Sequence, residues 1–190
     1  MRLESFWKEN KKALLSYMMV GYPDYKASLE AFRILLKEGT DILEIGFPFS
    51  DPVADGPTIQ YAHEIALRNG IKSEHVFELS STLRKEFPER PFLLMPYYNP
   101  IFKMGHENFC KRAKEAGIDG FIVPDLPPEE GGELKDYPFF FHLYTLVSIK
   151  KSGCPYSTVS PFSARIFTTL PLTSLSISFI TLRASIIQST

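Results

Sequence analysis

The sequence predicts an α/β fold in which parallel strands alternate with helices. Over residues 1–137, short apolar runs ending near Gly or Pro alternate with segments of helical periodicity, in units of roughly 30 residues. Helices of this kind supply the right-handed crossovers that parallel strands need. Four units use these 137 residues, whereas a complete eight-unit barrel takes about 250 residues. The pattern indicates an open sheet or about half of a barrel, and leaves both alternatives open.

The individual elements follow from the signals at their ends. Each predicted strand is a short apolar run, as expected of strands buried on both faces, and the four lie at 13–20, 41–46, 91–96 and 119–123. Asp24 is placed to N-cap the first helix, which Gly39 ends. Pro57 opens the second helix, which Gly70 closes. Further helices are predicted at 73–87, 107–116 and 129–135.

The second strand carries a carboxylate in an apolar setting. Because strand side chains alternate, Glu44 shares one face with Ile42 and Gly46, near the C-terminal end of the strand. Removal of water there would raise the pKa of Glu44, so we expect this group to donate a proton near neutral pH.

A long loop over residues 47–56 follows this strand and contains several prolines, and such connections are more often functional than filler. Asp55 lies just before a helix start, where the helix dipole favours the ionised carboxylate. Glu44 and Asp55 are therefore predicted to act as an acid and a base. The structural alternative is that Asp51 or Asp55 caps the next helix and that Glu44 pairs with a buried cation.

Residues 43–60 (LEIGFPFSDPVADGPTIQ) resemble the signature of the tryptophan synthase α chain family, LE-[aliphatic]-G-x-PFSDP-x-ADGPTIQ. Further agreement, in the family's order, lies at 17–23 (YMMVGYP), 94–102 (LMPYYNPIF) and 120–130 (GFIVPDLPPEE). The resemblance covers about residues 1–137. It implies a (β/α)8 TIM barrel, of which this chain carries about the first four βα units.

The resemblance implies a lyase of tryptophan biosynthesis that cleaves indole-3-glycerol phosphate to indole and glyceraldehyde 3-phosphate by a retro-aldol step. No cofactor or metal in this chain is implied. Glu44 falls on the catalytic glutamate, which protonates indole C3 and takes part in later proton transfers. Asp55 falls on the catalytic aspartate, which accepts a hydrogen bond from the indole N–H. Tyr17, Ile59 and Tyr97 are implied as walls of the indole pocket, with ordinary core packing as the alternative.

The resemblance also implies a partner, the tryptophan synthase β subunit, which carries pyridoxal phosphate and receives indole through an internal tunnel in an α2β2 complex. The loop at 47–56, Asn99 and the turn at 125–128, with Asp125 and Pro127, resemble the surface that faces this partner. Plain loop structure is the alternative for each.

The composition changes near Tyr137. All 22 acidic residues lie at or before Asp136, and Ser and Thr supply 17 of the 53 residues at 138–190. We interpret 1–137 as the N-terminal half of a barrel and 138–190 as a tail read out of frame, which we expect to be largely unstructured beyond a short strand at 142–147. The uncharged run at 166–182 is too short and too polar to span a membrane. Its β-prone segments, such as 176–182, are instead an aggregation hazard.

Composition also excludes several classes of function. A net charge of -1 and a pI near 6.4 give no reason to expect nucleic acid or an anionic membrane as partner. The N-terminus lacks the apolar run of a secretory signal, and the two cysteines lack CxxC spacing, so a cytoplasmic location is expected. The four histidines are scattered without metal-binding spacing.

Three functional alternatives remain at the level of sequence. The first is a lyase by ancestry with negligible turnover, because the tail has a single glycine, Gly153, and no Gly-rich turn for a phosphate. Half a barrel would also leave the first and fourth strands with unpaired edges. The second is a non-catalytic chain that binds the β subunit. The third, a small α/β phosphate-binding enzyme, is disfavoured because neither GxGxxG nor a P-loop is present.

Overall fold

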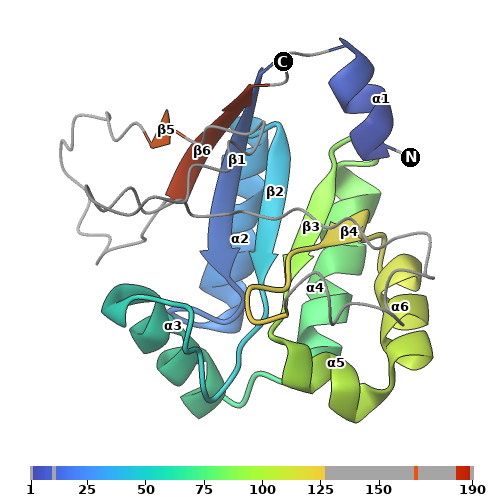
Figure 1. Ribbon diagram of the computed structural model, residues 1–190. Coiled ribbons are helices and arrows are strands. Elements are labelled where there is room, and N and C mark those ends of the chain that lie inside the picture. Colours follow the sequence, from blue (N-terminus) through green and yellow to red (C-terminus); the bar gives the residue numbers. More distant parts are fainter. Residues whose placement is uncertain (1, 10–11, 127–164, 167–182, 189–190) are drawn as a thin grey trace, which may run out of the picture.

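The structure, a computed structural model, describes residues 2–9, 12–126, 165–166 and 183–188. Within these residues the chain forms a sheet in the strand order β4-β3-β2-β1-β6-β5, accompanied by helices (Figure 1). The helix predicted at 129–135, the strand predicted at 142–147 and Pro127 lie outside the described residues.

Four parallel strands form the centre of the sheet, as the sequence predicts. They are β1 (Lys12–Met19), β2 (Ile42–Gly46), β3 (Phe92–Met95) and β4 (Gly120–Phe121). All adjacent pairs among them run parallel, and the register sets Glu44 opposite Tyr17 on one side and Leu93 on the other. The strands therefore end together at one edge, where the loop after β2 begins.

Six helices connect or flank these strands within the described residues: α1 (Arg2–Glu9), α2 (Tyr25–Lys37), α3 (Pro57–Arg68), α4 (Ser73–Glu86), α5 (Tyr98–Met104) and α6 (His106–Glu115). Asp24 caps α2 as predicted, since its Oδ1 accepts a 2.8 Å hydrogen bond from the Ala27 N–H. Helices α1 and α5 are not predicted from the sequence. Pro100 suggests a loop, but it lies in the first turn of α5, where a missing N–H breaks no helical hydrogen bond.

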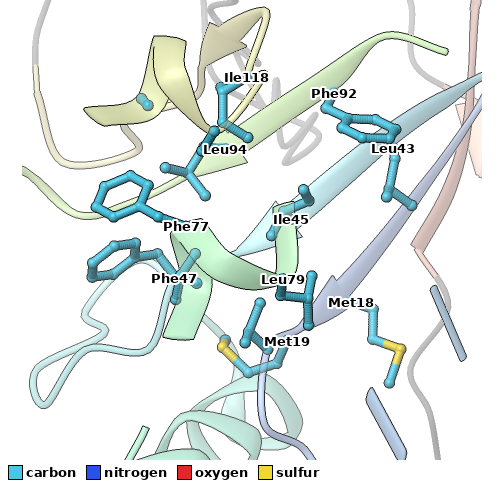
Figure 2. Close-up of a cluster of buried hydrophobic side chains, with 14 of the residues drawn as sticks. Met18, Met19, Leu43, Ile45, Phe47, Phe77, Leu79, Phe92, Leu94 and Ile118 are labelled. Carbon is cyan, nitrogen blue, oxygen red and sulfur yellow. The ribbon is translucent and has the colours of Figure 1, made fainter. Parts of the chain in front are cut away.

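The main hydrophobic core lies between the sheet and the helices. Alternate residues of β2 and β3, among them Leu43, Ile45 and Leu94, point to this side and are fully buried. Figure 2 shows Leu94 and Ile45 on the side of Phe47 and of Phe77 from α4, and Leu43 next to Phe92. The alternation is the one predicted for β2, whose odd-numbered residues face away from Glu44.

A second, smaller cluster lies on the opposite face of the sheet. It combines Leu15, Ile42 and Leu93 from three strands with Leu3 of α1, all of them buried. Leu3 and Phe6 of α1 thus pack against this cluster, and Figure 1 shows α1 near the ends where the parallel strands begin. Among the described residues, no helix has both the length and the apolar character that crossing a bilayer requires.

Two short segments of the tail are strands, β5 (Arg165–Ile166) and β6 (Arg183–Gln188). Strand β6 runs antiparallel to β1, from Lys12 opposite Gln188 to Tyr17 opposite Arg183. The prediction that the edge of the first strand stays unpaired is therefore wrong. The physical reason is that the unpaired N–H and C=O groups along an edge strand accept any available extended segment.

Candidate active site

Asp55 is the most buried carboxylate at the C-terminal edge of the strands, with only 2% of its side chain exposed. Its Oδ2 accepts a hydrogen bond of 2.8 Å from the Tyr97 hydroxyl. The Nε2 of His63, on α3, lies 3.2 Å from the same oxygen. Both neighbours are themselves buried, so the sequence brings three polar side chains together in a site shielded from water.

The loop over 47–56 is fixed by this polar group. The Phe49 N–H donates to His63 Nδ1 over 3.0 Å, and the Ala54 N–H donates to the Tyr97 hydroxyl, also over 3.0 Å. The Phe49 ring stacks on the ring of Tyr97, with 5.2 Å between centroids. The functional interpretation of the loop thus gains a physical basis, since both of its ends contact side chains that hold Asp55.

Desolvation and, after it, the hydrogen bond to Asp55 raise the pKa of Tyr97 well above its usual range. The phenol therefore stays protonated at physiological pH and acts as a donor to the carboxylate. This arrangement favours Asp55 as an acceptor, which is the role the sequence predicts for it.

Glu44 is half-buried on β2, between Tyr17 on β1 and Leu93 on β3. The sequence predicts Glu44 as the desolvated carboxylate, whereas in the structure Asp55 is the more deeply buried of the two. Asp55 is more enclosed because α3 and Tyr97 close over it. The elevated pKa predicted for Glu44 stays a prediction.

Two of the predicted wall residues pack into the same hydrophobic core, Tyr17 with 3% and Ile59 with 6% of the residue exposed. A Cβ atom at Gly46 would lie 2.6 Å from the Tyr17 hydroxyl oxygen. A glycine at the end of β2 therefore leaves room for the Tyr17 ring. Of the predicted wall residues, Tyr97 contacts Asp55 directly, and Tyr17 lies opposite Glu44 in the register.

The helix-cap interpretation of Asp55 is wrong. Gly56 is the N-cap residue of α3, and no side chain caps that helix end. Asp51 is exposed and accepts a 2.6 Å hydrogen bond from the Ser50 hydroxyl.

The buried Cys110 has a pKa raised by desolvation to about 11, so it packs as an uncharged thiol.

Two of the predicted partner-facing residues lie on the surface. Asn99 on α5 is exposed, and so is Asp125, whose Oδ1 accepts a 2.9 Å hydrogen bond from the Tyr98 N–H. The same loop and helix also expose hydrophobic side chains, since Val53 in the loop is 81% exposed and Phe102 on α5 is 65% exposed.

His63 was not among the predicted site residues. The usable signal in the sequence was its position four residues after Ile59 in a helix that begins just after Asp55, which places both side chains on one helix face. That signal is weak, because a histidine on a helix next to apolar residues is commonly a core residue. Its hydrogen bonds to Phe49 and Asp55 become visible only once the loop folds back over α3.

Four parallel βα units, with a buried carboxylate and a second carboxylate at the C-terminal edge of the strands, place this chain in the class of proteins built from the units of a βα barrel. A family model described as "Tryptophan synthase alpha chain" matches residues 3–147. The chain therefore belongs to the tryptophan synthase alpha chain family. The match extends beyond Tyr137, where the composition changes.

Curated relatives carry the same family name. The tryptophan synthase alpha chain of Aquifex aeolicus is 73% identical over 128 residues, which cover 67% of this chain and 49% of that one. The alpha chain of Methanosarcina mazei is 46% identical over 134 residues, 70% of this chain and 48% of the relative. The chain thus spans about half the length of these relatives.

Solved structures confirm the fold class. A protein from Aquifex aeolicus matches with a TM-score of 0.66 and 69% identity, covering 70% of this chain and 53% of that one. Tryptophan synthase subunit alpha from Legionella pneumophila matches with a TM-score of 0.66 and 42% identity, covering 70% and 51%. Of the two alternatives that the sequence pattern leaves open, half of a barrel is therefore confirmed, and an unrelated open sheet is rejected.

Proposed function

We propose that Glu44 and Asp55 are the acid and base residues of a tryptophan synthase α-type lyase, which cleaves indole-3-glycerol phosphate to indole and glyceraldehyde 3-phosphate in tryptophan biosynthesis. The observation that carries the proposal is the environment of Asp55. Its Oδ2 receives two protein donors, whereas its Oδ1 accepts no hydrogen bond from any residue that the structure describes. A ligand N–H can therefore bind at Oδ1.

The proposed reaction balances with these two groups. Protonated Glu44 gives its proton to indole C3, and the positive charge that develops on the ring nitrogen is stabilised by the Asp55 carboxylate. The carboxylate of Glu44 then takes the proton of the side-chain hydroxyl next to C3. The carbon–carbon bond breaks, its electrons return to the ring and neutralise the nitrogen, and the aldehyde leaves. Glu44 ends protonated, as it began.

Tyr17 and Tyr97 supply apolar ring surface beside the two carboxylates, which suits a flat aromatic substrate. No cofactor is required in this chain, because the indole ring itself accepts the electrons of the broken bond. Pyridoxal phosphate would belong to the β subunit, as the resemblance implies.

For the 190-residue chain itself we propose negligible turnover. The substrate carries a phosphate, and binding energy from such a non-reacting group normally contributes to lowering the barrier. The residues after 137 contain Gly153 alone and so lack a glycine-rich turn whose N–H groups could hold that phosphate. The acid and base are present without the second half of the substrate site.

Indole release from indole-3-glycerol phosphate tests this proposal. The purified chain should release no indole above background. A hybrid that joins residues 1–137 to the remaining C-terminal part of the Aquifex aeolicus alpha chain should be active. In that hybrid, Glu44→Gln and Asp55→Asn should each abolish turnover, whereas Asp51→Asn should not. A folded hybrid that stays active with Glu44→Gln would contradict the assignment.

A second candidate function is binding to a β subunit without catalysis. It is favoured by Val53 and Phe102, which expose large apolar surfaces on the loop and on α5. A structure titled as the tryptophan synthase complex from Pyrococcus furiosus matches at 39% identity with a TM-score of 0.63. Measuring β-subunit activity with and without this chain, and with Phe102→Ser, tests the idea, and no change on adding the chain would reject it.

A further inference from the structure

We propose that His63 is a positioning residue, which orients Asp55 so that Oδ1 faces the ligand as a hydrogen-bond acceptor. The inference rests on the proposed function, since it concerns the same carboxylate. It adds a residue that the sequence pattern did not indicate, and a specific chemical state for that residue.

The tautomer of His63 follows from its two hydrogen bonds. The Phe49 backbone N–H can only donate, so Nδ1, which lies 3.0 Å from it, must carry a lone pair. The ring proton then sits on Nε2, which faces Asp55 Oδ2 at 3.2 Å and donates to it. A doubly protonated ring would direct a second N–H at the Phe49 N–H. Both contacts are satisfied together by the neutral Nε2–H form.

The hydrogen bonds to Oδ2 also fix the rotation of the Asp55 carboxylate. The Tyr97 hydroxyl accepts from the Ala54 N–H and donates to Oδ2, so its proton is directed at the same oxygen that His63 contacts. Two donors from different elements on one oxygen fix the plane of the carboxylate. The other oxygen is left for a ligand N–H.

The charge of the Asp55 carboxylate has no cationic partner among the described residues. Both donors to Asp55 are neutral, and among the ion pairs formed by described residues none joins Asp55 to a lysine or arginine. The negative charge is therefore not compensated by a permanent cation within the site. Such a carboxylate is suited to stabilise a positive charge that appears in a ligand only during reaction.

The arrangement also links the loop to the carboxylate. His63 contacts Phe49 near the start of the loop and Asp55 near its end. If the loop moves away and Nδ1 loses its donor, the ring can take its proton on Nδ1, and the Nε2 lone pair then faces the carboxylate. Correct folding of the loop therefore selects the tautomer that holds Asp55.

The tautomer is measured directly by 15N NMR of the full 190-residue chain labelled at histidine, with His63→Gln used to assign the signal. We expect His63 in the Nε2–H form at neutral pH, and a change of its Nε2 signal in Asp55→Asn. His75 is the matched control, because its Nδ1 also accepts a backbone N–H, that of Lys72, over 3.0 Å. An Nδ1–H form of His63, or an Nε2 signal that does not change in Asp55→Asn, would overturn the inference.

Binding of indole as the probe separates this inference from the proposed function. We expect His63→Leu to weaken indole binding about tenfold, as for a lost hydrogen bond to a charged group. His63→Gln, which retains an N–H donor, should recover part of the loss, and His75→Gln should have no effect. Indole binding that depends on Asp55 but not on His63 would reject the positioning role alone. If the chain fails to bind indole at all, the proposed function loses its support, while the NMR result still decides the state of His63.

Discussion

Two buried aspartates lie at opposite ends of the same sheet and are held in opposite ways. Asp119 immediately precedes β4, at the end where the strands begin, and 6% of its side chain is exposed. Its Oδ1 accepts from Arg2 at 3.1 Å, and its Oδ2 accepts from Arg84 at 2.7 Å and from the Phe92 N–H at 2.9 Å. Asp55, at the other end, has two neutral donors on a single oxygen.

The contrast distinguishes a carboxylate with a structural role from the carboxylate that we propose to be functional. The guanidinium of Arg84 also donates to the carbonyls of Gly117, Phe87 and Arg90, and its Cζ lies 4.0 Å from the centroid of the Phe92 ring. The ionic group around Asp119 is thus saturated and ties neighbouring strands and loops together. Asp55 retains an unused oxygen and an uncompensated charge, and it lies at the end of the strands where barrel enzymes place their active sites.

The largest expected effect on stability is at the ionic group of Arg84 and Asp119. Arg84→Met removes the guanidinium but keeps most of the side-chain volume, and it leaves the buried Asp119 with Arg2, which is half-exposed, as its remaining cationic partner among the described residues. We expect a loss of about 3–5 kcal/mol in the free energy of unfolding, measured by urea denaturation. Arg68→Met is the control, because Arg68 pairs with Glu64 on the surface and should cost about 1 kcal/mol or less. Equal losses in the two variants would remove the distinction.

The same substitution at the two aspartates tests the comparison directly. In Asp119→Asn the new amide N–H2 points at a donor in either orientation, because both oxygens of Asp119 accept hydrogen bonds. We therefore expect a loss of about 2–4 kcal/mol in the free energy of unfolding. In Asp55→Asn the amide oxygen can still accept from Tyr97 and His63 while the N–H2 takes the place of Oδ1, so the expected loss is about 1 kcal/mol. Urea unfolding of both variants gives the difference. A larger loss at Asp55 would mean that the ligand-facing oxygen has a structural role.

The two ends also differ in how far the sequence could predict them. The strands, and Glu44 with Asp55, could be predicted because their signals are local: apolar runs, a proline-stiffened loop and a carboxylate before Gly56. The depth to which Asp55 is buried could not, because it depends on Tyr97, 42 positions further along the chain. The Arg84–Asp119 pair, 35 positions apart, escaped prediction for the same reason.

The missed elements have physical reasons of their own. Helix α5 contains Pro100, which suggests a loop unless its place in the first turn is known. Strand β6 has no signal beyond β-prone composition, since what selects it is the unpaired edge of β1 rather than its own sequence. Long-range pairing therefore marks the limit of sequence reasoning at both the site and the sheet edge.

The hydroxyl of Tyr97 links Asp55 to the loop at 47–56, because it donates to the carboxylate and accepts from the Ala54 N–H. Tyr97→Phe removes one of the two donors to Asp55 and also leaves the Ala54 N–H without its acceptor. We expect a loss of about 1–2 kcal/mol in the free energy of unfolding, by urea denaturation. Tyr61→Phe is the matched control on exposed α3 surface and should change little. If Tyr97→Phe is as harmless as Tyr61→Phe, the loop is held by packing of Phe49 rather than by this hydrogen bond.

The smallest effect is expected at an exposed counterpart of the Arg84–Asp119 pair. Arg33 donates to both oxygens of Glu86, at 2.8 and 2.6 Å, and this hydrogen bonding lowers the pKa of Glu86 below its usual 4.5. A carboxylate with a lowered folded-state pKa stabilises the fold above about pH 4.5, and that stabilisation is lost as the pH falls through the lower value. Stability curves of Glu86→Gln and the parent chain should therefore differ slightly at pH 7 and converge near pH 3. Because solvent screens both groups, the difference should be smaller than for any variant above. A difference that persists at pH 3 would show that Glu86 acts through packing and not through its charge.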